Sequence, residues 1–260
     1  MESITENVKE FLFETAEEVY KTLRSSSGTD FSKQVGMGAN GTPTSRIDEI
    51  AERVVIEKVK RESVPLNILS EEAEFIDNGA DMTLVLDPVD GTFNALLGTP
   101  FYSISMAVGE SCLSDVKYGL VRNLTDGDAY YAEKGKGAFL NGERIRTAGF
   151  DPEKSLFIVY IGKLAHPRSF EIAAKARRAR SFGAASLEMC YVASGQADLY
   201  YVDCDAMLRI IDIAAGALIV REAGGEVLDL EGRRLEMDFD ISSRSNFMVI
   251  GDERVLEVLG

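Results

Sequence analysis

Leu-Val-Leu-Asp-Pro-Val-Asp-Gly-Thr-Phe-Asn, residues 84–94, is the most informative segment of this chain. It begins with an apolar run typical of a buried strand and continues into Asp-Pro-Val-Asp-Gly, which is typical of a turn. Gly91 and Thr92 then open what we expect to be a helix, whose first backbone N–H groups could face an anion. Asp87 and Asp90 would therefore meet at a strand end. They indicate either an acidic turn in which Asp90 caps the helix, or a site for a hard divalent cation.

The composition is that of a soluble globular protein and argues against several classes of function. The chain has 260 residues, 45% of them hydrophobic and 27% charged, which permits one large domain or two packed halves. Its net charge of −15 opposes binding to nucleic acid and to anionic membranes. No apolar stretch is long enough to span a membrane, and the acidic, amphipathic N-terminus is unlike a signal peptide. We therefore expect a cytosolic protein.

Cysteine and histidine are scarce: Ser-His-Asp or Cys-His catalysis would depend on a single histidine, and His-rich metal sites are excluded. Cys112, Cys190 and Cys204 lie far apart without a C-x-x-C motif, as in proteins of a reducing compartment. His166 is the only histidine in the sequence, and we expect it in a surface loop rather than as a catalytic base. Any chemistry must therefore use carboxylates, hydroxyls and bound ions.

The hydrophobic pattern predicts an α+β first part that passes into an α/β second part. Residues 25–44, rich in Ser, Gly and Thr, read as a long loop that is mobile or functional. A change of composition near residues 148–154 suggests an N-terminal half, 1–150, and a C-terminal half, 151–260. The predicted helices cover residues 4–23, 47–59, 169–178, 184–193 and 210–223. The predicted strands cover residues 64–69, 82–86, 101–108, 116–121, 129–132, 156–161, 197–202, 226–230 and 247–250, with a hairpin turn at 140–143.

Three further acidic positions resemble the first in their placement. Glu71 ends a predicted strand, where a solvated strand end is the alternative to a ligand. Asp48 follows Ser45 at the start of a helix, where capping is equally open. Asp212 lies among isoleucines and would be a buried charge, and buried charges are paired or bound to metal.

Taken together, these motifs resemble the inositol monophosphatase superfamily. They are Asp-Pro-Val-Asp-Gly-Thr at 87–92, Glu71-Glu72 upstream, and Asp-Ile-Ala-Ala-Gly from Asp212 followed by Glu-Ala-Gly-Gly at 222–225. The resemblance covers nearly the whole chain. It implies a layered αβαβα sandwich, a homodimer, and a Mg²⁺-dependent, lithium-sensitive phosphatase of sugar phosphates. Leu-Arg-Ile before Ile211 and Asp212 looks most like the archaeal members, which are similar in hydrolysing both fructose 1,6-bisphosphate and inositol 1-phosphate.

The resemblance also implies which residues form the site. Two or three Mg²⁺ ions, for which Mn²⁺ could substitute, would be held by the side chains of Glu71, Asp87, Asp90 and Asp212 and by the carbonyl of Val89. Asp48, Thr92 and Glu71 would act on the attacking water. Asp90, Gly91 and Thr92 would bind the phosphate, and Ala185 and Asp205 the sugar ring. Arg180 and Arg209 are candidates for a second phosphate, because guanidinium groups bind phosphate bidentately.

Some of these assignments have alternatives. Ala185 could be a helix-packing residue, and Arg209 could pair with a neighbouring acid. Ile211 stands where many relatives carry Trp, which changes packing but removes no ligand. The segment 202–206 is longer than in the eukaryotic relatives, which weakens the assignment of Asp205.

Two other functions remain open. A phosphatase of NADP or of 3′-phosphoadenosine compounds would use the same ions, but it needs an apolar shelf for the purine, which the sequence does not identify. A non-enzymatic acidic regulatory protein could use the same fold to bind RNA or a protein, although the net charge opposes RNA. Phosphate release from the candidate substrates separates these possibilities.

Overall fold

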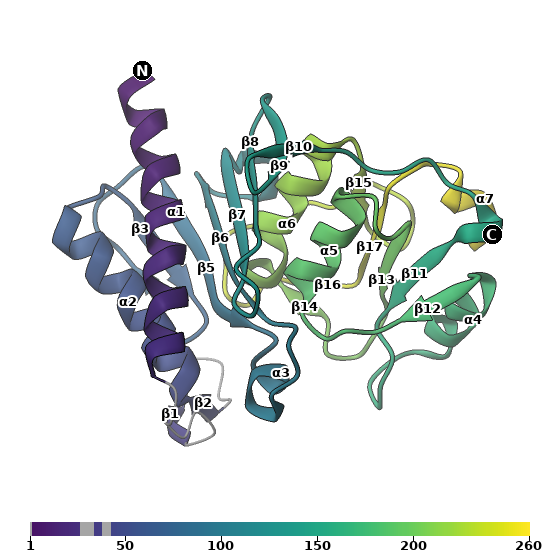
Figure 1. The fold of residues 1–260 in the computed structure, drawn as a ribbon, viewed down its shortest axis with the longest axis horizontal. Helices are drawn as coiled ribbons and strands as arrows, with labels where there is room; N and C mark the ends of the chain where they lie inside the picture. The colour runs from purple at the N-terminus through teal and green to yellow at the C-terminus, as the bar shows by residue number, and fades with distance from the viewer. Residues whose placement is uncertain (1, 27–33, 38–42) are drawn as a thin grey trace.

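Helices and sheets alternate in five layers in the computed structural model, which describes residues 2–26, 34–37 and 43–260 (Figure 1). Two helices cover the outer face of an eight-stranded sheet, two more lie between this sheet and a five-stranded one, and the last two cover the outer face of the second sheet. This arrangement confirms the predicted αβαβα sandwich. In layer order the helices are α1 (Glu2–Ser25) and α2 (Arg46–Glu62), then α5 (Ala185–Ala193) and α6 (Ile210–Ala223), then α4 (Pro167–Lys175) and α7 (Val255–Leu259).

The larger sheet places the central acidic strand between two helical layers. Its strand order is β10-β9-β8-β7-β6-β5-β3-β4, and only the β3–β5 pair is parallel. Every residue of β5 is buried, because helices cover both faces of the sheet. The strands are β3 (Asn67–Ser70), β4 (Glu74–Ile76), β5 (Thr83–Asp90), β6 (Ser103–Gly109), β7 (Tyr118–Asn123), β8 (Ala129–Glu133), β9 (Gly137–Leu140) and β10 (Glu143–Ile145).

The smaller sheet has the strand order β12-β11-β13-β17-β15, with β11 parallel to both of its neighbours and β17 antiparallel to both of its own. Its strands are β11 (Leu156–Val159), β12 (Arg178–Arg180), β13 (Leu199–Val202), β15 (Glu226–Leu228) and β17 (Phe247–Ile250). The remaining elements are short: the paired strands β1 (Gln34–Met37) and β2 (Pro43–Ser45), the paired strands β14 (Leu208–Arg209) and β16 (Arg244–Ser245), helix α3 (Thr92–Leu97), and the 3₁₀ turns η1 (Leu113–Asp115) and η2 (Pro152–Lys154).

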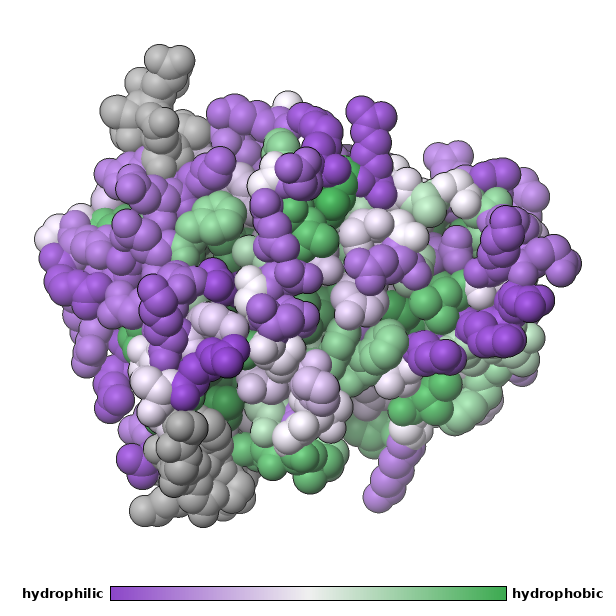
Figure 2. All heavy atoms as spheres, viewed as in Figure 1, coloured by the Kyte–Doolittle hydropathy of each residue, from purple (hydrophilic) through white to green (hydrophobic). Residues whose placement is uncertain are grey.

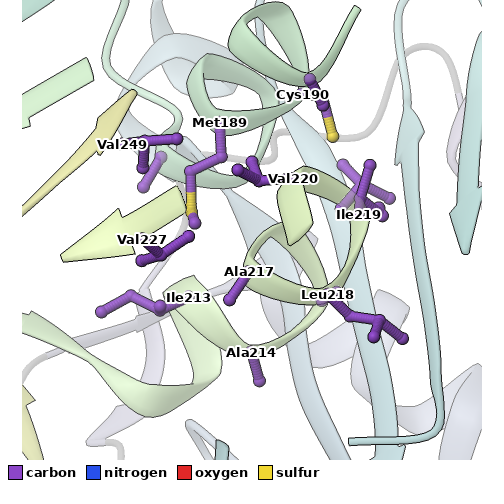
Figure 3. Packing of buried hydrophobic residues seen from close by; sticks show 14 of the residues in the cluster. Met189, Cys190, Ile213, Ala214, Ala217, Leu218, Ile219, Val220, Val227 and Val249 are labelled. Carbon is purple, nitrogen blue, oxygen red and sulfur yellow. The ribbon is translucent and has the colours of Figure 1, made fainter. Parts of the chain in front are cut away.

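The largest hydrophobic cluster surrounds the middle helical layer. Helix α6 is buried almost all round, as expected for a helix enclosed between two sheets. Figure 3 shows Met189 of α5 and Ile213 of α6 near Val227 and Val249 of the smaller sheet. Cys190 joins this cluster as a buried apolar residue, and all three cysteines are free thiols. The middle layer therefore fixes the two sheets relative to each other.

Hydrophilic and hydrophobic residues are unevenly distributed over the surface. Figure 2 shows hydrophilic residues over the outer face formed by α1 and α2, and hydrophobic ones gathered at the edge where α3 lies. On α3, Phe93 is 73% exposed and Leu97 66% exposed. None of the helices in the described part of the chain has the length and apolarity needed to cross a bilayer.

Several predictions of local structure are wrong. Asp-Pro-Val-Asp is not a turn after a strand: β5 continues to Asp90, and only its pairing with β6 becomes irregular between Asp87 and Asp90. Pro88 explains part of this irregularity because it has no N–H to offer the ladder. The helix predicted over 169–178 ends at Lys175, and β12 follows as an edge strand.

The other differences lie near the N-terminus and in the division of the chain. Within the predicted loop 25–44, β1 and β2 pair with each other, whereas residues 27–33 and 38–42 are outside the described part. Ser45 does not cap the backbone of α2; its hydroxyl donates to the Asp48 carboxylate instead. The division into halves 1–150 and 151–260 falls between β10 and β11 and stays a prediction.

Candidate active site

Four of the predicted acidic residues, Glu71, Asp87, Asp90 and Asp212, line one pocket of about 240 Å³. It lies where the carboxyl end of β5 meets the first turns of α5 and α6 from the other half of the chain. Because β3 and β5 are parallel neighbours, the residues that follow their carboxyl ends reach the same edge of the sheet. The lining residues are Glu71, Asp87, Val89, Asp90, Gly91, Thr92, Tyr160, Gly183, Ala185, Glu188, Tyr200, Leu208, Arg209 and Asp212.

Asp87 is the most buried carboxylate of the pocket. Only 3% of its surface is exposed, and its Oδ1 accepts a hydrogen bond from the Val89 N–H at 3.1 Å. Burial, and then the nearby carboxylates of Asp90, Glu71 and Asp212, raise its pKa well above the usual range, while Arg209 opposes the shift. Negative charge is therefore costly here unless a cation shares the site.

Asp90 joins the two halves of the site. Its Oδ1 accepts from the Ala185 N–H at 3.0 Å, and its Oδ2 accepts from the Ser186 N–H at 2.7 Å and the Ser186 hydroxyl at 2.6 Å. These donors lie in the first turn of α5, where the N–H groups have no partner inside the helix. Burial raises the pKa of Asp90 to about 6, and Asp212 adds to the shift, against the lowering effect of Ser186 and Ala185.

Arg209 places a positive charge between two of the acids. Its Nη1 donates to Oε1 of Glu71 at 2.6 Å, and its Nη2 lies 3.3 Å from Oδ1 of Asp212. The Arg209 backbone N–H also donates to Oδ2 of Asp212 at 2.7 Å, which closes the first turn of α6. Burial would lower the pKa of Arg209, but Asp212, Glu71 and Asp87 outweigh it and raise that pKa above its usual value.

Asp48 and Thr92 form a hydrogen-bonded pair beside the pocket. The Thr92 hydroxyl lies 2.9 Å from Oδ1 of Asp48 and 2.9 Å from the Val89 carbonyl oxygen. Asp48 is 5% exposed. Burial raises its pKa to about 6, and Glu71 adds to the shift, whereas Ser45 and Thr92 lower it. The pair predicted to act on the attacking water is therefore in contact.

The chemistry of the donor set fits a hard divalent cation. The pocket offers carboxylate oxygens and the Val89 carbonyl, which are the ligands that Mg²⁺ prefers. A 2+ ion would also relieve the repulsion that raises the pKa of Asp87. As placed, however, no three acidic, histidine or cysteine side chains in the described part of the chain could hold one ion together. The exact ligand set stays a prediction.

The substrate contacts predicted from the sequence are only partly brought together. Gly91, Thr92, Ala185 and Arg209 line the pocket, whereas Arg180 and Asp205 do not. Arg180 is exposed on β12 and donates to the Ala179 carbonyl.

Asp205 contacts the single histidine instead. The two ring nitrogens of His166 lie 2.6 Å from Asp203 and 2.8 Å from Asp205. These partners, Asp205 first, raise the pKa of His166. The histidine precedes α4, outside the pocket lining, and the roles of Asp205 and Arg180 toward substrate stay predictions.

Sequence reasoning missed Ser186, Glu188 and two tyrosines of the pocket wall, Tyr160 and Tyr200. Glu188 is buried and accepts from the N–H groups of Phe182 at 2.6 Å and Gly183 at 3.1 Å. Burial raises its pKa to about 7. The sequence signal that could have identified Glu188 is a single acid in a helix of small and apolar residues, which indicates a buried, hydrogen-bonded charge.

Comparison with known proteins agrees with this arrangement. A model of the inositol monophosphatase family matches residues 4–255. A fructose-1,6-bisphosphatase/inositol-1-monophosphatase from Thermococcus kodakarensis is 34% identical over 97% of this chain and 96% of its own length. A bifunctional NADP phosphatase/NAD kinase from Methanococcus maripaludis is 37% identical over 90% of the chain, which spans 45% of that longer protein.

A solved structure supports the same assignment. The crystal structure of an inositol monophosphatase–fructose 1,6-bisphosphatase superimposes with a TM-score of 0.86 and 34% identity, over 96% of this chain and 97% of that one. The family model, the full-length relative and this structure agree. The chain therefore belongs to the inositol monophosphatase family and is a phosphoric monoester hydrolase of that family.

Proposed function

We propose that the protein is a Mg²⁺-dependent phosphatase that hydrolyses fructose 1,6-bisphosphate and inositol 1-phosphate through an activated water. The observation that carries the proposal is the convergence of Glu71, Asp87, Asp90 and Asp212 on one small pocket from distant parts of the chain. The name of the Thermococcus relative, a fructose-1,6-bisphosphatase/inositol-1-monophosphatase that matches over nearly its whole length, supports the choice of substrates.

The chain's own residues have separable roles in this mechanism. When bound, Mg²⁺ supplies charge neutralisation for the phosphate and lowers the pKa of a water molecule. Glu71, Asp87, Asp90 and Asp212, with the Val89 carbonyl, would hold the ions. Gly91 and Thr92 would face the phosphate with their backbone N–H groups.

Asp48 and Thr92 would act on the water. Because the Thr92 hydroxyl bonds to Oδ1 of Asp48, its oxygen can accept a hydrogen bond from the water and orient it. A carboxyl with a pKa near 6 can also take up a proton reversibly close to neutral pH. Phosphoryl transfer depends mainly on positioning and on charge neutralisation, so the pocket needs no histidine.

A nucleotide phosphatase is the second candidate, because the Methanococcus relative is named as an NADP phosphatase. Tyr160 and Leu208 on the pocket wall could provide the apolar shelf that a purine requires. A non-enzymatic regulatory role has no comparable support.

One assay tests the proposal. Phosphate release is measured with Mg²⁺ for fructose 1,6-bisphosphate, inositol 1-phosphate and NADP side by side, with EDTA and with added Li⁺ as further arms. We expect release from the first two substrates, its loss with EDTA, and inhibition by Li⁺. Faster release from NADP would favour the second candidate, and no release from any of the three would overturn both.

We also propose that the protein is a cytoplasmic homodimer, as the family resemblance implies. The exposed Phe93 and Leu97 of α3 form an apolar surface that a second copy could cover. Light scattering after gel filtration measures the mass directly. We expect twice the chain mass of 28.5 kDa, and a species of single-chain mass at micromolar concentration would contradict the dimer.

A further inference from the structure

Arg209 bonds to carboxylate oxygen atoms that the proposed metal site requires. Its Nη1 bonds to Oε1 of Glu71 at 2.6 Å, and its side chain reaches both carboxylate oxygens of Asp212, with Nη2 3.3 Å from Oδ1 and Nε 3.5 Å from Oδ2. The Arg209 side chain is only 14% exposed, so this contact is held inside the pocket. Glu71 and Asp212 are two of the four carboxylates to which the proposed function assigns Mg²⁺.

We propose that Arg209 is an internal counter-ion that competes with Mg²⁺ for Glu71 and Asp212 and has to release at least one of them when the ion binds. This inference rests on the proposed function, because it requires the ion to use these carboxylates. It goes beyond that function because it makes the apparent Mg²⁺ affinity depend on an arginine that is not itself a ligand.

Electrostatics supports the competition. A guanidinium and a divalent ion on the same carboxylates stand only a few ångströms apart, and like charges at that distance repel strongly in a buried site. The short Arg209–Glu71 bond is a charge-assisted hydrogen bond, which an entering ion has to displace or weaken. The ion therefore binds with less free energy than the same carboxylates would give it without the arginine.

The same contact explains how the four carboxylates assigned to Mg²⁺ can share a pocket before any ion arrives. Arg209 is the one Lys or Arg among the lining residues, all of which are in the described part of the chain. Its guanidinium bonds to Glu71 at 2.6 Å and lies 3.3 Å from Asp212. Removing the arginine takes away a positive charge that bonds to two of these carboxylates, which destabilises the ion-free fold.

The backbone permits the exchange that the proposal needs. Arg209 is anchored through its main chain, which pairs with Arg244 in β16 and donates to Asp212 at the start of α6. The bonds to Glu71 and to Oδ1 of Asp212 are made only by the end of the long side chain. A rotation of the side chain can therefore free the carboxylates while β14 and α6 stay in place.

The test is Mg²⁺ binding to the substrate-free protein, measured by calorimetry for the natural chain and for Arg209→Met. Methionine keeps a similar length without the charge. We expect Arg209→Met to bind Mg²⁺ roughly tenfold more tightly or better, since even a well-screened charge this close is worth about that factor. Its melting temperature should fall in EDTA and rise on adding Mg²⁺ by more than that of the natural chain.

Arg233→Met is the matched control. Arg233 also pairs with two carboxylates, those of Asp229 and Glu231, but its side chain is 74% exposed and lies outside the pocket. Its loss removes the same charge from the protein and should leave Mg²⁺ affinity unchanged. Equal tightening in both variants would mean that net charge, rather than competition at the site, controls the affinity, and this would overturn the inference.

The remaining outcomes distinguish a failure of this inference from a failure of the proposed function on which it rests. If the natural chain binds Mg²⁺ and Arg209→Met binds it equally or more weakly, the competition is disproved and the proposed function stands. If the natural chain binds no Mg²⁺, the proposed function fails first. Should Arg209→Met not fold without ions, Arg209→Gln, which keeps hydrogen-bonding groups but no charge, takes its place with the same expected tightening.

Discussion

Replacing Asp212 with asparagine lowers the rate of Mg²⁺-dependent phosphate release on the order of a thousandfold, as expected when a charged group that stabilises the transition state is removed. The side chain keeps an oxygen that can accept the Arg209 backbone N–H, so the first turn of α6 remains closed. What is lost is one negative charge toward the proposed ion. The measurement is kcat at saturating Mg²⁺, together with circular dichroism to show that the fold is kept.

Glu188→Gln is the control for this result. Glu188 is a buried acid of the same pocket, but it accepts hydrogen bonds from the N–H groups of Phe182 and Gly183. A glutamine oxygen can still accept from both. We expect its kcat to stay within about tenfold of the natural value, since the hydrogen bonds can be kept and no proposed ligand is lost. Near-normal turnover in Asp212→Asn, or equal losses in the two variants, would show that Asp212 holds no ion.

Asp90→Asn should abolish activity as well, but with a second effect. Asp90 accepts from two N–H groups and one hydroxyl of α5, and an amide cannot accept from all of them. We therefore expect a loss of about 1–3 kcal/mol in the free energy of unfolding besides the loss of turnover. This difference makes Asp212 the cleaner test of the ion.

The placement of the acidic residues that line the pocket can be predicted from the sequence where the signal is local. Asp87 and Asp90 follow an apolar run, and Glu71 follows another, so their position toward the carboxyl ends of strands can be inferred from neighbours in the chain, although β5 runs on to Asp90. Their convergence follows because β3 and β5 are parallel and adjacent. The layered fold followed from the family resemblance, whose motifs are spread over most of the chain.

The contacts that the sequence does not predict depend on how distant segments pack. Ser186 meets Asp90 across 96 positions of sequence, and no local pattern connects them. The bond between Arg209 and Glu71 spans 138 positions and depends on the direction of one flexible side chain. Strand β12 was missed because Arg-Ala-Arg at an edge has no apolar face, and only pairing with β11 makes it a strand.

Gly91→Ala is the second change for which we expect a large effect, because this glycine connects the acidic strand β5 to α3. Its φ of +89° lies in the left-handed region that alanine adopts only at a cost. An added Cβ would also stand 3.0 Å from the Ala184 Cβ, 3.1 Å from the Phe101 carbonyl oxygen and 3.2 Å from the Gly183 carbonyl oxygen. Two of these contacts are with backbone carbonyl oxygens, which cannot move away by a side-chain rotation. The turn at residues 90–92 therefore has to shift away from the segment that leads into α5.

Gly98→Ala separates the two causes. Gly98 ends the same short helix with a φ of +73°, but an added Cβ there meets nothing within 4 Å. Both variants should lose about 1 kcal/mol of unfolding free energy from the backbone conformation, and Gly91→Ala about 1–3 kcal/mol more from the clash. Only Gly91→Ala should also lose kcat, by roughly a hundredfold, because a shift of about 1 Å in a positioning group costs that much. If the two variants instead lost stability and turnover alike, the close packing of Gly91 against Ala184 would not be what aligns the turn proposed to bind phosphate with the carboxylates.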